Sequence, residues 1–512
     1  MRLDAFREIV DAEHVVTDPA ELERASTATF GTSARVLGIV RPADLEQVRA
    51  VLRRASEAGA PVYPVSGGKN WGLGSRVPPA DALLLDLGRL SRILDYDEEL
   101  ATVTLEPGVT FRQLYAFLCE RRSRLFAATT GGSPDGSVIA NALERGDGSG
   151  PNGDRALHVT ALEVVLPTGE VLHTGFDRFD GASSARLHRS GVGPALDGLF
   201  FQSNLGVVTK ATVWLAPLPR YLAAIRFGVR DDAALARVLD AVRRLRLDGT
   251  LRSPVGIWND YRVLSVAERF PAGEAVPLAR ERLADKARAW GGARWLGLCS
   301  VYAGERALGE AALAHVQAEL RPHVESASVD AASGDPVAGE ELLPTTDPAF
   351  AFLQGVPHEQ SLRSLYWRMP RAAPERPDPD SDGVGALWLC PTLPLEGSCV
   401  ADRTARVERR MLEHGFEPLL VLLCHGERSV QLLVMISFDR GLPGADTQAL
   451  ACHAALLADL VADGHIPQRL ALPAHGALPP SRDDFDAVLR RLKAALDPAG
   501  VLSPGRYLAD PG

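Results

Sequence analysis

The chain has 512 residues, of which 46% are hydrophobic and 23% are charged, and its formal net charge is −10. This length exceeds what one hydrophobic core organises, so at least two domains are expected. The negative charge argues against nucleic acid or an anionic membrane as the main partner. Six scattered cysteines without a Cys-x-x-Cys pair argue against a zinc site and a disulfide framework. Because no apolar run has the length of a membrane span or a signal peptide, we expect a cytoplasmic protein.

The first elements predicted along the chain are a helix and a strand that leads into a glycine-rich loop. Residues 41–59 have the apolar spacing of a helix, with an acidic residue in the first turn and a glycine at the end. The β-branched residues of 62–65 indicate a strand. Further strands are predicted at 101–105 and 162–166, so the first part of the chain is expected to be α/β or α+β.

The loop at 64–75 contains four glycines and an asparagine. Glycine lets consecutive backbone N–H groups converge on an anion, so the loop suits a pyrophosphate. It is not a Walker loop, because no Gly-Lys-Ser/Thr run opens a helix, and it lacks the Gly-x-Gly-x-x-Gly spacing of a dinucleotide fingerprint. On its own such a loop is more often a surface turn, so phosphate binding depends on the motifs that follow.

The pattern of predicted elements changes after residue 219. Amphipathic helices are predicted at about 231–247, 276–290 and 303–321, with apolar strands at 295–302 and 419–424. The segment 372–383 is rich in proline and aspartate and is predicted to be a mobile surface loop.

Further motifs follow the glycine loop in order. They occupy residues 83–94, 101–115, 136–146, 161–172, 201–210 and 496–506. In this order and spacing they resemble the vanillyl-alcohol oxidase / p-cresol methylhydroxylase family of FAD enzymes, over nearly the whole chain. The resemblance implies a two-domain α+β fold. A discontinuous FAD-binding domain would span 1–215 and 467–512, and a cap domain with an antiparallel sheet and flanking helices would span 216–466. It also implies an FAD-dependent oxidase or dehydrogenase, and a homodimer.

The resemblance assigns a set of cofactor-binding residues. Those along the FAD phosphates would be Ser66, Gly67, Gly68, Lys69 and Asn70. Those approaching the flavin would be Gly131, Ser137, Ile139 and Asn141, with Val208 near the adenine or ribose. Several of these glycines could equally serve only to make turns.

The substrate pocket implied by the resemblance departs from the family's phenol-oxidising pattern. Leu73 stands where phenol oxidisers carry a tyrosine, and Gly132 stands where they carry an aspartate beside the flavin. Gln468-Arg469 replaces the tyrosine–arginine pair that clamps the phenolate oxygen. These losses argue against a simple 4-alkylphenol as substrate. The arginine that remains suits a carboxylate or a phenolate.

Three residues are therefore candidate catalytic residues. Arg469 could bind charge that develops on the substrate, or could instead form a structural salt bridge between the domains. Gln468 is included because it occupies the position of the lost tyrosine. His425 follows the apolar strand at 419–424, which faces the flavin in the family, so it could accept a proton as hydride leaves. Ordinary packing is the alternative for His425. No cluster of residues has metal-ligand spacing, so no metal is expected.

The covalent flavin link of some family members is expected to be missing. Ala386 stands where they carry a histidine or tyrosine in the cap, and Lys69 stands where others carry a histidine in the glycine loop. We therefore expect non-covalent FAD.

The functional hypothesis is oxidation of a small organic substrate by hydride transfer to flavin N5. An alcohol, an amine or a carboxylate-bearing intermediate of secondary metabolism fits better than an alkylphenol. The electron acceptor is oxygen or another molecule, and Ala140, where relatives usually have glycine, favours a dehydrogenase. Two alternatives remain: a flavin-dependent isomerase or cyclase without net oxidation, and a scaffold or binding protein that has lost catalysis.

Overall fold

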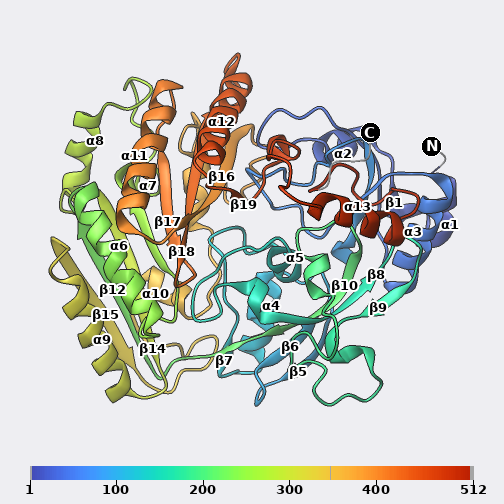
Figure 1. Cartoon of the computed structure of the whole chain (residues 1–512), viewed down its shortest axis with the longest axis horizontal. Helices are drawn as coiled ribbons and strands as arrows, with labels where there is room; N and C mark the ends of the chain where they lie inside the picture. The colour runs from blue at the N-terminus through green and yellow to red at the C-terminus, as the bar shows by residue number, and fades with distance from the viewer. Residues whose placement is uncertain (1–2, 346, 508–512) are drawn as a thin grey trace.

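The computed structural model describes residues 3–345 and 347–507. In Figure 1 the N-terminal part of the chain, blue to green, forms the right-hand region, and the following residues up to the orange elements form the left-hand region. The red C-terminal helix α13 (Phe485–Leu496) returns to the right-hand region. Among the described helices, none combines the length and apolarity needed to cross a membrane.

The right-hand region begins with a four-stranded sheet in the order β1-β2-β4-β3. Its strands are β1 (Val15–Val16), β2 (Val36–Val40), β3 (Val62–Val65) and β4 (Ala82–Asp86), and its helices are α1 (Asp4–Val10), α2 (Pro19–Ala25) and α3 (Leu45–Ala58). Helix α3 is the helix predicted at 41–59. The Asp44 carboxylate accepts a hydrogen bond from the Gln47 N–H, and Gly59 ends the helix in the left-handed conformation. Strand β3 runs parallel to β4 and leads into the glycine loop.

A five-stranded antiparallel sheet in the order β5-β6-β10-β8-β9 completes this region. Its strands are β5 (Ile93–Asp97), β6 (Thr102–Leu105), β8 (Val159–Val165), β9 (Val171–His173) and β10 (Val207–Trp214). The strands predicted at 101–105 and 162–166 are β6 and β8. Helices α4 (Phe111–Glu120) and α5 (Val138–Leu143) belong here, and β7 (Leu125–Phe126) pairs with β11 (Ala216–Pro217).

The left-hand region is built on one eight-stranded sheet, β15-β12-β14-β13-β17-β18-β16-β19, in which all neighbours are antiparallel. Its strands are β12 (Tyr221–Val229), β13 (Val255–Asn259), β14 (Trp295–Ala303), β15 (Ser326–Ser333), β16 (Val384–Pro394), β17 (Leu419–Cys424), β18 (Ser429–Asp439) and β19 (Pro467–Arg469). The strands predicted at 295–302 and 419–424 are β14 and β17.

Four long helices cover the outer face of this sheet (Figure 1). They are α6 (Asp232–Leu247), α9 (Arg306–Leu320), α11 (Gly397–Glu413) and α12 (Ala445–Ala462). Shorter helices lie in the connections: α7 (Asp260–Ala267), α8 (Arg280–Ala287) and α10 (Pro348–Leu353). The helices predicted at 231–247 and 303–321 are α6 and α9, whereas α8 is shorter than the predicted 276–290. The outer helices leave the opposite face of the sheet for the site described below.

The proline- and aspartate-rich segment 372–383 is a surface loop at its start, as predicted, with residues 372 and 374–376 exposed, but it is buried further along. Asp380 is only 7% exposed. Its carboxylate accepts hydrogen bonds from the Trp71 indole N–H (3.2 Å) and the Ser75 hydroxyl (2.7 Å). This aspartate fixes the segment against the glycine loop, which composition alone does not reveal.

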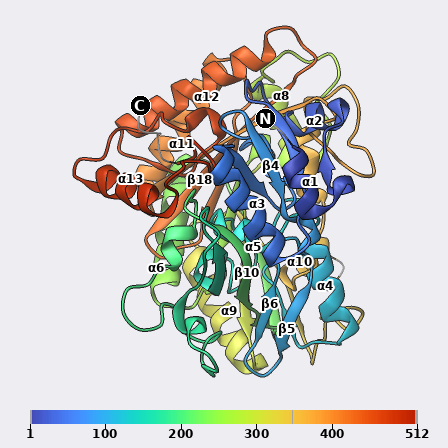
Figure 2. The same ribbon diagram turned by 90° about the vertical axis from the view of Figure 1, so that its right-hand side faces the viewer.

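The C-terminal residues complete the first sheet. The Val62 N–H donates to the Val501 carbonyl (2.8 Å), and the Ser503 N–H donates to the Val62 carbonyl (2.8 Å). Figure 2 turns this region toward the viewer and shows α13 at its left, α3 in the middle, and α1 and α2 at its right. Strand β19 ends the eight-stranded sheet just beyond residue 466, and the exact domain boundaries stay a prediction.

Candidate active site

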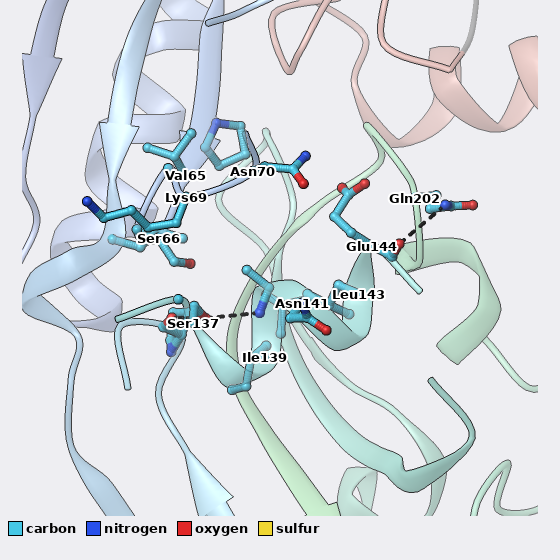
Figure 3. Close-up of a pocket in the computed structure, with 18 of the residues that line it drawn as sticks. Val65, Ser66, Lys69, Asn70, Ser137, Ile139, Asn141, Leu143, Glu144 and Gln202 are labelled. Carbon is cyan, nitrogen blue, oxygen red and sulfur yellow. Dashed lines mark hydrogen bonds between the residues drawn. The ribbon is translucent and has the colours of Figure 1, made fainter. Parts of the chain in front are cut away.

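The glycine loop lines a cavity, here called the loop cavity, with an empty volume of about 1230 Å³. Figure 3 shows the loop facing the start of α5 across the cavity. Of the predicted cofactor-binding residues, the loop cavity is lined by Ser66, Gly67, Gly68, Lys69, Asn70, Ser137, Ile139, Asn141 and Val208. Gly131 lines the neighbouring cavity instead.

The backbone of the loop is arranged as an anion site. Among the described residues, none accepts a hydrogen bond from the N–H groups of Gly67, Gly68, Lys69 or Asn70. Gly68 has φ +64°, a conformation that favours glycine. Four successive N–H groups without acceptors form a cradle for a pyrophosphate, so the residues present fit FAD.

A partly buried ionic network lines the loop cavity. The Glu144 carboxylate accepts hydrogen bonds from the Arg506 guanidinium (2.5 Å) and the Tyr507 hydroxyl (2.6 Å). Arg506 also donates to the Tyr63 hydroxyl. Burial works to raise the pKa of Glu144, but Arg506 and the Tyr507 hydroxyl lower it more, so the pKa lies below its usual value. The carboxylate therefore stays ionised.

A second cavity, the cap cavity, lies against the inner face of the eight-stranded sheet and has an empty volume of about 1600 Å³. It shares Asn70, Asn141 and Arg469 with the loop cavity, so the two are continuous. Its apolar walls are Trp71, Leu73, Trp258, Leu298, Phe352, Leu365, Trp388, Val421, Leu423 and Leu433. The glycine loop is joined to this wall, because the Trp388 N–H donates to the Gly72 carbonyl (2.9 Å). A ligand that extends from the loop cavity into the cap cavity would thus be surrounded by aromatic and other apolar side chains.

Arg469 stands where the two cavities meet. Strand β19 pairs Arg469 with Cys390 of β16. The Arg469 guanidinium donates to the Asn70 side-chain oxygen (3.1 Å), and its buried Nε has no acceptor among the described residues. Gln468 is placed differently: its carbonyl accepts from Gln202 (2.8 Å), and its side chain lines neither cavity. Successive strand residues point to opposite faces, so a pair in sequence is not a pair in the site.

His425 also lines the cap cavity, directly after β17. Its side chain is 7% exposed, and its Nε2 lies 3.1 Å from the Asp147 carboxylate without hydrogen-bond geometry. The Gln431 amide donates to the same Asp147 oxygen (3.3 Å). The arrangement gives the cavity a histidine beside a carboxylate, a pair that can hold a proton.

Two arginines of the site had no sequence signal. Arg155 donates to the Asn141 side-chain oxygen and the Ala128 carbonyl (3.1 Å), and burial lowers its pKa to about 9. Arg262, in the first turn of α7, lines the cap cavity. Neither lies in a glycine motif or follows an apolar strand. Only the folded chain brings Arg155 to Asn141 and Arg262 to the cap cavity.

Comparison with known proteins agrees with this geometry. Residues 36–175 match the family model described as FAD binding domain. The chain is 44% identical to 1'-carboxy-chondrochloren decarboxylase from Chondromyces crocatus over 99% of its own length and 96% of the relative. It is 25% identical to the 4-cresol dehydrogenase [hydroxylating] flavoprotein subunit from Pseudomonas putida, over 97% and 92%. The chain belongs to the vanillyl-alcohol oxidase / p-cresol methylhydroxylase family. Its cofactor is FAD.

The fold of this family member is that of p-cresol methylhydroxylase. The crystal structure of that enzyme with substrate bound superimposes with a TM-score of 0.88 at 23% identity, covering 99% of this chain and 96% of the other. The predicted two-domain α+β fold and the FAD cofactor are thereby confirmed. The reaction and the roles of individual residues are not settled by likeness, because one relative is a decarboxylase and the other a dehydrogenase.

Proposed function

We propose that this flavoprotein oxidatively decarboxylates a carboxylate-bearing organic substrate in the cap cavity. The observation that carries the proposal is Arg469, whose guanidinium stands at the junction of the two cavities with an unpaired Nε. A guanidinium presents donors in a fork that matches a carboxylate. The similarity to a relative named as a 1'-carboxy-chondrochloren decarboxylase, over 99% of this chain, supports a carboxylate as the reacting group.

When bound, FAD supplies the two-electron acceptor that this reaction needs. The substrate loses a hydride from one carbon and carbon dioxide from the adjacent carbon. The electron pair of the broken carbon–carboxylate bond becomes a carbon–carbon double bond. Charge balances because the carboxylate departs as neutral carbon dioxide while its negative charge leaves with the hydride. The reaction therefore needs no net proton transfer from the protein.

The chain's own residues supply binding and orientation. The loop N–H groups of Gly67 to Asn70 would hold the pyrophosphate, and Arg469 would hold the carboxylate next to the cofactor. Trp258 and Trp388 suit an aromatic ring in the substrate. The relative named 4-cresol dehydrogenase acts, by its name, on a methyl group attached to a ring. By analogy, the hydride donor here would be a carbon attached to a ring, one bond from the carbon that carries the carboxylate.

A second candidate is oxidation of an alcohol or amine without loss of carbon dioxide. The observation that favours it is the His425–Asp147 pair in the cap cavity. Such an oxidation needs a base for the hydroxyl or ammonium proton, whereas the decarboxylation does not. His425 would be that base.

We also propose that FAD is held without a covalent bond. Ala386 is fully buried, and its backbone pairs with Thr29 on both sides. An alanine methyl offers no nucleophile, and a lysine occupies the other family anchor position. After acid precipitation of the holoenzyme, flavin absorbance should appear in the supernatant; flavin retained in the pellet would contradict the proposal.

The test uses 3-(4-hydroxyphenyl)propanoate and ring-substituted analogues, labelled with ¹³C at the carboxyl carbon. Under anaerobic conditions, decarboxylation predicts bleaching of flavin absorbance, release of labelled carbon dioxide and formation of a vinylphenol. Replacing Arg469 by methionine should slow bleaching about 100-fold, as loss of a charge-stabilising donor does. Arg237→Met, the same change at an exposed position of α6, should not.

Each outcome separates the candidates. Bleaching with a carbonyl product and no carbon dioxide would replace the proposal with alcohol or amine oxidation. A product of unchanged mass without bleaching would indicate an isomerase or cyclase. A holoenzyme that none of these carboxylates bleaches would argue against the decarboxylation.

A further inference from the structure

Arg262 is a buried cation without a counter-ion. The residue is 7% exposed, and its buried Nε and Nη1 have no hydrogen-bond acceptor among the described residues. No described carboxylate forms an ion pair with it. The guanidinium lies over the Trp388 ring in a cation–π contact, with 5.9 Å between its central carbon and the ring centroid. Burial lowers the pKa of Arg262 only to about 10, so the side chain is charged at neutral pH.

Nearby arginines are paired, which makes Arg262 an exception within its own surroundings. Asp260, two residues earlier, is the nearest acid in the sequence. Its carboxylate instead accepts from Arg280 (2.5 Å) and Arg294 (2.9 Å), and Glu408 accepts from the same two arginines. The nearby carboxylates are thus paired with Arg280, at the start of α8, and with Arg294, just before β14. Arg262 is left without an acidic partner among the described residues.

An unpaired buried charge is costly, because the protein offers it no polar partner in exchange for its hydration. Arg262 faces the cap cavity, among the aromatic side chains of Trp71, Trp258 and Trp388. It does not line the loop cavity, whereas Arg469 lines both. The two guanidinium groups therefore line different parts of one chamber: Arg469 the part shared with the loop cavity, and Arg262 a part that belongs to the cap cavity alone.

We propose that Arg262 binds an anionic oxygen group, a carboxylate or a phenolate, at the end of the substrate remote from FAD. The substrate is then an elongated aromatic molecule with an acceptor group at each end, one held by Arg469 and the other by Arg262. This inference rests on the proposed function, since it names the class of substrate that fits the same cavity. Arg262 acts as a specificity-determining residue, not as a catalytic one.

The test compares binding of one-ended and two-ended probes to the holoenzyme by anaerobic isothermal titration calorimetry. The one-ended probe is 4-methylphenylacetate. The two-ended probes are 1,4-phenylenediacetate, with a second carboxylate, and 4-hydroxy-3-nitrophenylacetate, whose phenol ionises at pH 8. The first two-ended probe tests for a carboxylate at Arg262, and the second tests for a phenolate.

The wild type should bind at least one two-ended probe about tenfold or more tightly than the one-ended probe, as expected of a hydrogen bond to a charged group. Arg262→Met should abolish that preference, so that all three probes bind equally. Arg262→Lys should retain part of it, and provides the comparison if the methionine variant does not fold. Arg237→Met should behave like the wild type.

In the Arg262→Met variant, two results would overturn the inference: survival of the two-ended preference, or loss of FAD, which would make Arg262 a cofactor ligand. The readout needs no turnover. Failure of the carbon dioxide assay with the two-ended preference intact would therefore sink the proposed reaction alone. Carbon dioxide release without any two-ended preference would sink this inference alone.

Discussion

In the loop cavity, two charged side chains already have protein partners, because Glu144 and Arg506 are paired with each other. In the cap cavity, Arg262 and the Nε of Arg469 have none. A site whose ligand is always the same cofactor can complete its side-chain network in advance and leave only backbone N–H groups open. A site that must select a substrate keeps side-chain charges open, at a cost in stability that the substrate offsets.

The contact between the two cavities should be the most sensitive point. Gly72 has φ +78°, and an added Cβ would lie 2.1 Å from Trp388 Cδ1. Gly72→Ala should cost about 3–5 kcal/mol from overpacking and backbone strain together, and should weaken FAD binding. Urea unfolding and flavin release measure the two effects.

The control for Gly72 is Gly59→Ala, which has φ +59° but nothing within 4 Å of the added Cβ. It should lose only the backbone strain, about 1–2 kcal/mol. Equal losses of unfolding free energy in the two variants would show that the Trp388 side chain moves away from the added Cβ at little cost. The contact between Gly72 and Trp388 would then not couple the two cavities.

Charge removal should have opposite effects in the two cavities. Glu144→Gln leaves Arg506 without its counter-ion and should destabilise the protein by about 2–3 kcal/mol, somewhat less than a fully buried pair, because the side chains are 24% and 14% exposed. Arg262→Met removes an unpaired charge and should leave stability unchanged or raise it. Urea unfolding of both FAD-loaded variants measures this. Destabilisation of the same size in both would break the contrast.

Asp380, which binds the glycine loop through Trp71 and Ser75, should make the stability of the protein depend on pH. Burial raises the pKa of this carboxyl to about 7, with Asp378 adding to the rise and Ser75, Arg76 and Trp71 opposing it. An unfolded aspartate titrates near 3.9, so between about pH 4 and pH 7 the folded state holds more protons than the unfolded state. Stability of the wild type should therefore fall as pH rises through that window.

The matched variant for this window is Asp380→Asn. Its amide can accept from the Trp71 N–H and donate to the Ser75 hydroxyl, without the titration. Thermal unfolding should show the variant equal to the wild type near pH 4 and more stable above pH 7. A parallel pH profile in both proteins would mean that another group controls the window.

The smallest expected effect concerns oxygen. Ala140 lines the loop cavity on α5, and Ala142, two residues on, does not. If its methyl hinders oxygen, Ala140→Gly should raise the rate at which oxygen reoxidises the dithionite-reduced holoenzyme severalfold, measured by stopped-flow absorbance. Ala142→Gly carries the same helix cost without the opening, and an equal rise in both would remove the methyl as the cause.

What the sequence could predict follows the same division. The loop cavity is made by backbone, and backbone leaves local marks: glycines at 67 and 68, the strand before them, and the helix 45–58 with its cap. The cap cavity is made by side chains from distant strands and connections, of which the strand 419–424, His425 and Arg469 could be named in advance and most others leave no local mark. Arg262 has no motif around it, and Gln468 beside Arg469 looked like a pair until the strand turned them to opposite faces.

The burial of Asp380 could not be predicted from the sequence for a related reason. Proline and aspartate are typical of exposed loops, and composition does not report that an indole and a hydroxyl elsewhere in the chain offer hydrogen bonds. A carboxylate becomes buried where donors converge on it, and convergence is a property of the whole fold.

The pairing of Val62 with Val501 has a consequence for biosynthesis. The strand that precedes the glycine loop gains this neighbour only after residue 501 has left the ribosome. The eight-stranded sheet, by contrast, has all its strands by residue 469 and can assemble while the C-terminal tail is still being translated. We therefore expect nascent chains released before residue 500 to contain a protected cap and an open cofactor region, so that FAD loading is among the last events in maturation.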